Sequence, residues 1–193
     1  RLQIGSLDGY GLMMAKIGSG SNLPGYYMFT GGSNPHGLLT SMEENREETG
    51  YWNTNPIISY DFQAVIRESG ELNGSYFEIK KLHYFLNEFG DRLAPMEPVL
   101  TENKDGFQVA LRVQDKSAFL FGINYCRHNL TSDKKNVQFN IQVQNENLQF
   151  PSKPINISDS SFIMWPVNFS MQNILLRYAT AQPLCVIGGK WIF

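Results

Sequence analysis

The apolar residues of this chain follow two different periods, and the change lies at a proline-rich stretch. Before it they recur at helical spacing, whereas after it they alternate with polar residues. Pro95 and Pro98 mark the change, because proline has no backbone N–H and ends a helix. We therefore expect two domains, at residues 1–94 and 95–193.

Residues 75–90 carry the clearest helical signal. Ser75 and Glu78 have the spacing of a capping box, apolar residues follow at intervals of three and four, and Gly90 stands where a helix-ending glycine is common. A shorter helix is expected over Tyr10–Ile17.

Between these helices lies an aromatic run, Tyr26–Thr30, bounded by Pro24–Gly25 and Gly31–Gly32. Such a run predicts a buried strand. The order helix, strand, long loop and helix is typical of an α/β architecture.

The second half alternates between apolar and polar residues in several segments separated by Asn, Asp, Gly and Ser. This pattern predicts a small antiparallel β-sandwich or barrel, and we expect the sandwich. Phe107–Val113 and Val137–Val143 alternate, whereas Ala118–Tyr125 is predicted as a strand of the buried type. Phe162–Met164 and Leu184–Ile187 are further expected strands.

Charge and composition argue against several classes of partner and cofactor. The 16 basic and 18 acidic residues give a formal charge of −2, so we expect no nucleic-acid partner. No apolar run is long enough to span a bilayer, and no membrane partner is expected. The 3 histidines are widely spaced, and no metal or other cofactor is expected. Cys126 and Cys185 form either one disulfide or two free thiols, and the second reading is favoured.

The segment from Gly31 to Ile58 is too long for an ordinary connection, which favours a functional or disordered loop. Trp52 within it either stacks on the apolar face of a sugar or folds back onto the domain. Tyr27, Tyr60 and Asp61 are polar groups next to apolar strand residues. Each alone has a structural explanation, but as a group they suggest a pocket.

Two of these segments resemble a known family. Tyr26–Asn34 followed by Ser59–Ala64 resembles the end of the catalytic barrel of glycoside hydrolase family 35, the β-galactosidases. Arg67–Gly70 and Tyr76–Ile79 stand at the family's next acidic step and at the start of its next helix. The likeness covers residues 23–90 in the same order. The second half is also similar to the β-domain that follows the barrel in long bacterial relatives.

The resemblance implies that residues 1–94 are the C-terminal part of a (β/α)₈ TIM barrel, followed by the sandwich. Because ligands of such barrels lie at the C-terminal ends of the strands, the loop after the last strand faces the substrate. The substrate-binding residues implied are Tyr27, Asn34, Trp52, Tyr60 and Asp61. Phe62 stands where the family has a tyrosine, which removes a hydroxyl and affects sugar preference.

The family's catalytic glutamates come from barrel strands upstream of this chain. No glutamate here matches either role, so no catalytic residue is assigned. The function expected is a fragment of a retaining, exo-acting β-galactosidase, inactive without the missing upstream part of the barrel, acting on terminal galactosides or glycans.

The alternative is a non-catalytic β-sandwich that binds carbohydrate or forms an interface, based on Trp165 and Tyr178. Core and interdomain packing is the favoured explanation of these two side chains. Hydrolysis of large glycans suggests a secreted or periplasmic enzyme, although the sequence does not fix the compartment.

Overall fold

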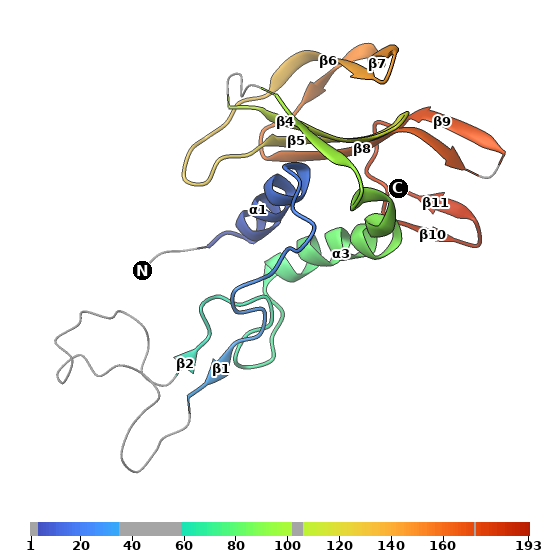
Figure 1. Ribbon diagram of the computed structural model, residues 1–193. Helices are drawn as coiled ribbons and strands as arrows, with labels where there is room; N and C mark the ends of the chain where they lie inside the picture. Colours follow the sequence, from blue (N-terminus) through green and yellow to red (C-terminus); the bar gives the residue numbers. More distant parts are fainter. Residues whose placement is uncertain (1–3, 35–58, 102–105, 172) are drawn as a thin grey trace. The chain divides into compact units, whose positions relative to one another are not determined.

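The computed structural model describes residues 4–34, 59–101, 106–171 and 173–193 (Figure 1). They form two compact units. The smaller comprises residues 1–9 and 25–79, and the larger comprises residues 10–24 and 80–193. These units follow spatial packing and do not coincide with the ranges 1–94 and 95–193 expected above.

Helix α1 spans Ser6–Gly18, so the helix expected over Tyr10–Ile17 is confirmed and begins earlier. Asp8, in the first turn, accepts a hydrogen bond from the N–H of Gly5 at 2.6 Å. This contact satisfies a donor that the start of a helix leaves without an intrahelical partner.

Helix α3 spans Gly74–Leu93, so the expected stop at Gly90 is wrong and the start lies one residue before Ser75. A Cβ at Gly90 would meet nothing within 4 Å, which shows that this glycine faces open space. Phe89 and Leu93 are buried on either side of it. Their burial outweighs the cost of about 1 kcal/mol that glycine imposes within a helix.

The larger unit is built on an antiparallel sheet, which confirms the β-rich second half (Figure 1). Its order is β3-β4-β5-β8-β9, with bounds Glu97–Leu100, Gln108–Gln114, Ser117–Asn124, Ser161–Met171 and Ile174–Tyr178. Two further antiparallel hairpins are β6–β7, at Lys134–Val143 and Glu146–Ile157, and β10–β11, at Cys185–Ile187 and Lys190–Ile192.

The β6–β7 hairpin covers one face of the five-stranded sheet. Leu120 and Val167 of the sheet share a buried cluster with Phe139 and Phe150 of the hairpin. Trp165 belongs to the same cluster, with 7% of its surface exposed. The second layer of the expected sandwich is therefore a two-stranded hairpin.

Helices cover the opposite face of the same sheet. The ring of Phe119 lies 5.2 Å from that of Phe85 on α3. Phe121 lies so close to α1 that a Cβ at Gly18 would be 3.0 Å from the Phe121 Cβ. Phe119 and Phe121 of β5 thus face the helices, whereas Leu120 between them faces the hairpin, as the alternation of side chains along a strand requires.

Arg112 on β4 joins the ends of both helices and the linker. Its side chain is 1% exposed. The guanidinium donates to carbonyl oxygens at the ends of α1 and α3 and in the linker, and to one side-chain oxygen. The acceptors are Ile17 O at 2.8 Å, Met96 O at 2.8 Å, Asn22 Oδ1 at 2.9 Å, Leu93 O at 3.0 Å and Ala94 O at 3.4 Å.

In the smaller unit the buried strand expected over Tyr26–Thr30 is not formed. Met28 has a φ of 59°, which places it in the left-handed region and interrupts an extended chain. Thr30 forms an isolated parallel bridge with Ile66, the only parallel contact among the strands and bridges of the described residues. Tyr27 is 80% exposed.

The sequence favours free thiols at Cys126 and Cys185 and predicts no membrane-spanning segment. Cys126 is exposed, Cys185 is partly buried, and both are free thiols. No helix within the described ranges has the length and hydropathy needed to cross a membrane.

Candidate functional site

The two sequence segments that carry the resemblance lie side by side in the smaller unit. Strand β1, Gly32–Ser33, pairs antiparallel with strand β2, Ser59–Tyr60. Gly32 lies opposite Tyr60, and Ser33 opposite Ser59. Segments separated by the long loop therefore form one local structure.

Gly31 is required by this close approach. A Cβ at Gly31 would lie 2.8 Å from the backbone nitrogen of Glu68 and 2.9 Å from Oδ1 of Asp61. Any larger residue would push backbone atoms apart. The N–H of Gly31 also donates to Ile66 O at 2.7 Å, which fixes the position of this glycine.

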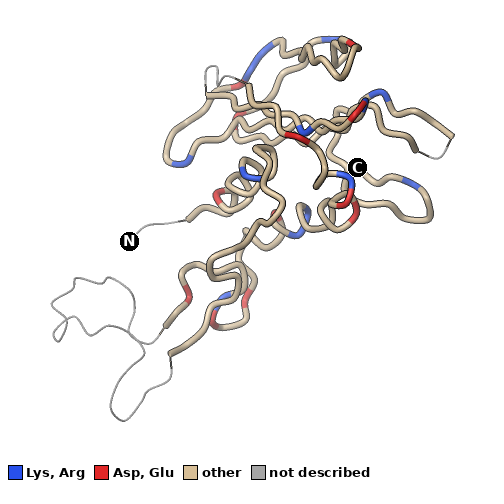
Figure 2. Tube along the Cα trace, in the orientation of Figure 1, with Lys and Arg blue, Asp and Glu red and all other residues tan. Residues whose placement is uncertain are grey.

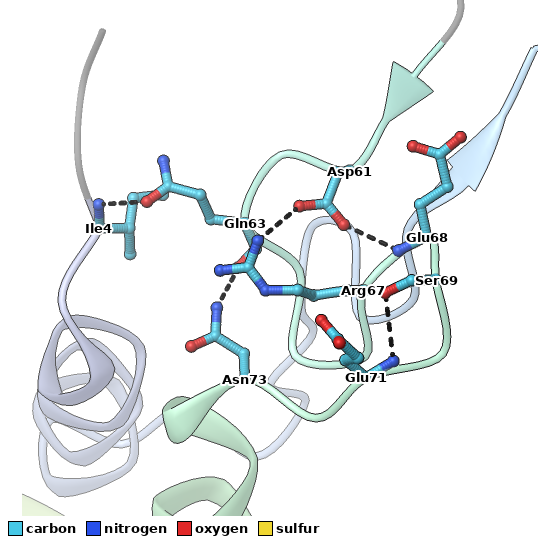
Figure 3. A network of polar contacts seen from close by, with 8 residues as sticks. All are labelled: Ile4, Asp61, Gln63, Arg67, Glu68, Ser69, Glu71 and Asn73. Carbon is cyan, nitrogen blue, oxygen red and sulfur yellow. Dashed lines mark hydrogen bonds and ion pairs between the residues drawn. The ribbon is translucent and has the colours of Figure 1, made fainter.

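Asp61 organises the turn that follows β2 (Figure 3). Its Oδ1 accepts a hydrogen bond from the N–H of Glu68 at 2.8 Å, and its Oδ2 accepts one from Arg67 Nη1 at 3.3 Å. Phe62 and Gln63 have φ values of 45° and 57°. Left-handed backbone at residues other than glycine costs about 1–2 kcal/mol each, and the contacts of Asp61 offset part of this cost.

A second polar group in this region is the carboxylate of Glu68, which points away from that of Asp61 (Figure 3). It accepts a hydrogen bond from the hydroxyl of Ser33. This contact, and a weaker one with the Ser59 hydroxyl, hold the pKa of Glu68 below its ordinary value. Glu68 thereby connects β1, β2 and the turn after them.

Sequence reasoning did not include Glu68 among the site residues. The segment Arg67–Gly70 matches an acidic segment of the family it resembles, but no spacing in the sequence relates Glu68 to Ser33. The relation depends on the β1–β2 pairing, which is a long-range contact.

Three aromatic rings form a further part of the site, in which Tyr27 is exposed and Tyr60 and Phe62 are partly buried. The hydroxyl oxygens of Tyr27 and Tyr60 are 3.3 Å apart, within hydrogen-bonding distance. The ring of Phe62 lies edge-on to both, with centroids 4.5 Å from Tyr60 and 6.1 Å from Tyr27. Burial raises the pKa of the phenol of Tyr26, whose ring packs against Phe29. We call Tyr27, Tyr60 and Phe62 the aromatic group.

The structure thus brings together Tyr27, Tyr60 and Asp61 of the expected substrate-binding residues. Asn34 directly follows β1 and is partly buried. Trp52 lies outside the described residues. The expected binding role of each of these residues remains a prediction.

The aromatic residues proposed for a binding sandwich, Trp165 and Tyr178, lie elsewhere and have structural roles. Trp165 is buried and packs edge-on against Phe139, with ring centroids 5.9 Å apart. The hydroxyl of Tyr178 accepts a hydrogen bond from the N–H of Ser152 at 3.0 Å, and its ring packs against Phe150. Core packing explains both side chains.

The larger unit contains a cavity of about 230 Å³ between α1 and strands β3, β4 and β5. Apolar residues such as Met14, Val109 and Phe121 dominate its lining, and the polar ones are Ser19, Thr101 and Gln108. None of the described residues that line it is acidic or basic. Across the described ranges, no three His, Cys, Asp or Glu residues gather as a metal site.

Comparisons with known proteins leave the family open. No protein-family model matches this chain, and no curated protein matches it either.

Proposed function

We propose that this chain is the C-terminal part of a retaining, exo-acting β-galactosidase-like glycoside hydrolase. Residues 1–94 would complete a (β/α)₈ barrel, and the β-rich region would follow it. The observation that carries the proposal is the antiparallel pairing of β1 with β2. It brings together the two segments that resemble family 35 and leaves Tyr27 exposed beside Tyr60.

The aromatic group supplies features that a sugar pocket uses. Two adjacent hydroxyls can each donate and accept hydrogen bonds, and a neighbouring apolar ring can pack against C–H groups of a sugar. Asp61 and Glu68 bind protein groups, so their proposed role is to hold this surface in shape. The proton transfer and the covalent intermediate need two carboxylates about 5–5.5 Å apart, which we assign to the upstream part of the barrel.

The proposed reaction uses protein carboxylates only and needs no metal or organic cofactor. The substrate would be a terminal β-galactoside, and an enzyme acting on large glycans would work outside the cytoplasm. Phe62 supplies no hydroxyl beside Tyr60, so the preferred sugar need not be galactose itself.

The test uses the chain joined to its upstream coding sequence and a chromogenic β-galactoside. Tyr27→Phe and Tyr60→Phe each remove one hydroxyl and are expected to lower kcat/KM about tenfold or more. Tyr84→Phe is the matched control, since Tyr84 is an exposed tyrosine of α3, with 47% of its surface accessible.

Two results would contradict the proposal. One is the absence of any glycosidase activity in the extended protein. The other is turnover by the 193-residue chain alone that disappears when a glutamate within it is changed.

A further inference from the structure

The β6–β7 hairpin carries an unusual concentration of carboxamide side chains. Residues 134–157 include 5 asparagines and 4 glutamines. In the paired strands, Asn140 lies opposite Gln149, and Gln142 lies opposite Asn147. All four are exposed. We call these four residues the carboxamide face.

The buried side of the hairpin fixes the orientation of this face. Phe139, Ile141, Val143 and Phe150 alternate with the carboxamides and lie in the buried cluster against the five-stranded sheet. Shifting either strand by one residue would expose these apolar side chains, so the register is strongly specified. The carboxamides are therefore held on the solvent side.

Their hydrogen-bonding capacity is available to a ligand. Other carboxamides of the hairpin are used internally: Gln138 Nε2 donates to Pro151 O at 2.9 Å, and Asn156 Oδ1 accepts from the N–H of Asn136 at 3.2 Å. In the part of the chain that the structure describes, the side chains of the carboxamide face form no hydrogen bond with another protein group.

The face also has no charge of its own. The acidic residue at the adjoining turn, Glu146, forms an ion pair with Arg177, which holds the pKa of its carboxyl below the ordinary value. Lys134 and Lys135 lie at the start of β6, and the exposed Lys153 lies on β7 four residues beyond Gln149. Figure 2 shows the hairpin uncharged over most of its length.

We propose that the carboxamide face binds a neutral oligosaccharide chain. Each carboxamide offers one acceptor oxygen and an NH₂ donor, and each sugar hydroxyl both donates and accepts. Directly opposite Cβ atoms are about 4.5–5.5 Å apart, and successive pairs along the strands are separated by about 7 Å. The four side chains therefore form a regular two-by-two array of donors and acceptors, with no charge among them, that suits a polyhydroxylated chain.

This inference does not rest on the proposed function, because the face and the aromatic group share no residue. It also differs from the carbohydrate-binding alternative considered from the sequence, which depended on Trp165 and Tyr178. A second copy of the chain, joined through paired carboxamides at the hairpin, is the competing occupant.

Native gel electrophoresis with and without a soluble β-galactan, or an uncharged soluble β-glucan, tests the proposal without measuring turnover. Retardation of the chain by at least one of these polymers is expected. The double change Asn140→Ala with Gln149→Ala should weaken the affinity about tenfold, since two exposed hydrogen bonds are lost. The pair Gln142→Ala with Asn147→Ala should act in the same direction.

The control is Gln114→Ala, which removes an exposed carboxamide from β4, outside the face, and should leave retardation unchanged. Urea midpoints close to that of the unchanged chain establish that the variants fold. The proposal is overturned if neither polymer retards the chain, or if both double variants are retarded as strongly as the original. It is also overturned if sedimentation shows a dimer that both double variants abolish, because the face would then be a contact between copies.

Discussion

Replacing Arg112 tests whether one side chain holds the helix ends against the sheet. The residue is almost fully buried, and its guanidinium satisfies carbonyl oxygens at the ends of α1 and α3 and in the linker. Arg112→Met keeps most of the apolar stem but removes every donor. Ile17 O and Leu93 O would each keep one backbone donor, the N–H of Gly20 at 3.1 Å and the N–H of Met96 at 3.0 Å. Met96 O would lose the donor that Arg112 Nε supplies at 2.8 Å.

The magnitude follows from these three acceptors. Each of them loses a hydrogen bond from a charged donor, and such a bond contributes about 1.5–3 kcal/mol. Part of the sum is recovered because a buried charge is also removed. Burial lowers the pKa of Arg112, which indicates that its charged form is incompletely solvated. A net loss of about 3–5 kcal/mol in the free energy of unfolding is expected. Arg112→Lys should lose about half as much, because one ammonium cannot reach all the acceptors.

Urea unfolding followed by tryptophan fluorescence measures this loss. With a slope of about 2 kcal/mol per molar urea, the midpoint of Arg112→Met should fall by about 1.5–2.5 M. Arg177→Met is the control, since Arg177 is an exposed arginine whose ion pair with Glu146 contributes little. A fall of less than about 0.5 M with unchanged slope would show that the helix ends do not depend on Arg112.

Three further predictions concern single residues. Gly31→Ala should destabilise the smaller unit by about 1–3 kcal/mol and speed hydrogen exchange of its own N–H, whereas Gly32→Ala, whose Cβ meets nothing within 4 Å, should do neither. Ser33→Ala should raise the pKa of Glu68 towards its ordinary value in a carboxyl-carbon NMR titration, and an unmoved pKa would exclude the hydrogen bond as its cause. Because the folded pKa of Glu68 is the lower one, its stabilising contribution is present above the unfolded pKa and is lost as pH falls through the folded one. Phe119→Ala should cost about 3–5 kcal/mol in urea unfolding, since this ring is fully buried, and a cost below about 1 kcal/mol would contradict the packing described.

Several strands of the β-rich region could be predicted from alternation. Val137, Phe139, Ile141 and Val143 follow a period of two, and the structure buries the last three beneath the carboxamide face. Alternation worked here because one face of the hairpin packs on the sheet and the other meets water. Alternation also located β4 to within one residue at each end, and a continuous apolar run did the same for β5.

The two wrong predictions of secondary structure have a common cause, which is long-range packing. Gly90 looked like a helix stop, but burial of Phe89 and Leu93 carries α3 past it. The aromatic run Tyr26–Thr30 looked like a strand, yet a strand needs a hydrogen-bonding neighbour along its edge, and Ile66 supplies only an isolated bridge.

The candidate site was predicted in part. The two segments were expected to meet, and their pairing as β1 and β2 is observed. The left-handed backbone at Phe62 and Gln63, and the contact between Ser33 and Glu68, had no local signal, because neither residue type nor spacing encodes them.

The two-sided sheet has a consequence for trimming the protein. A chain cut back to residues 95–193 would retain Phe119 and Phe121 but lose Met14, Ile17 and Phe85 from the helices of the larger unit. Arg112 would keep only Met96 among its acceptors. The shortened chain would expose an apolar surface formed by these phenylalanines, together with an arginine that has lost most of its hydrogen-bond acceptors. We expect it to precipitate unless residues 10–24 and 80–94 are retained.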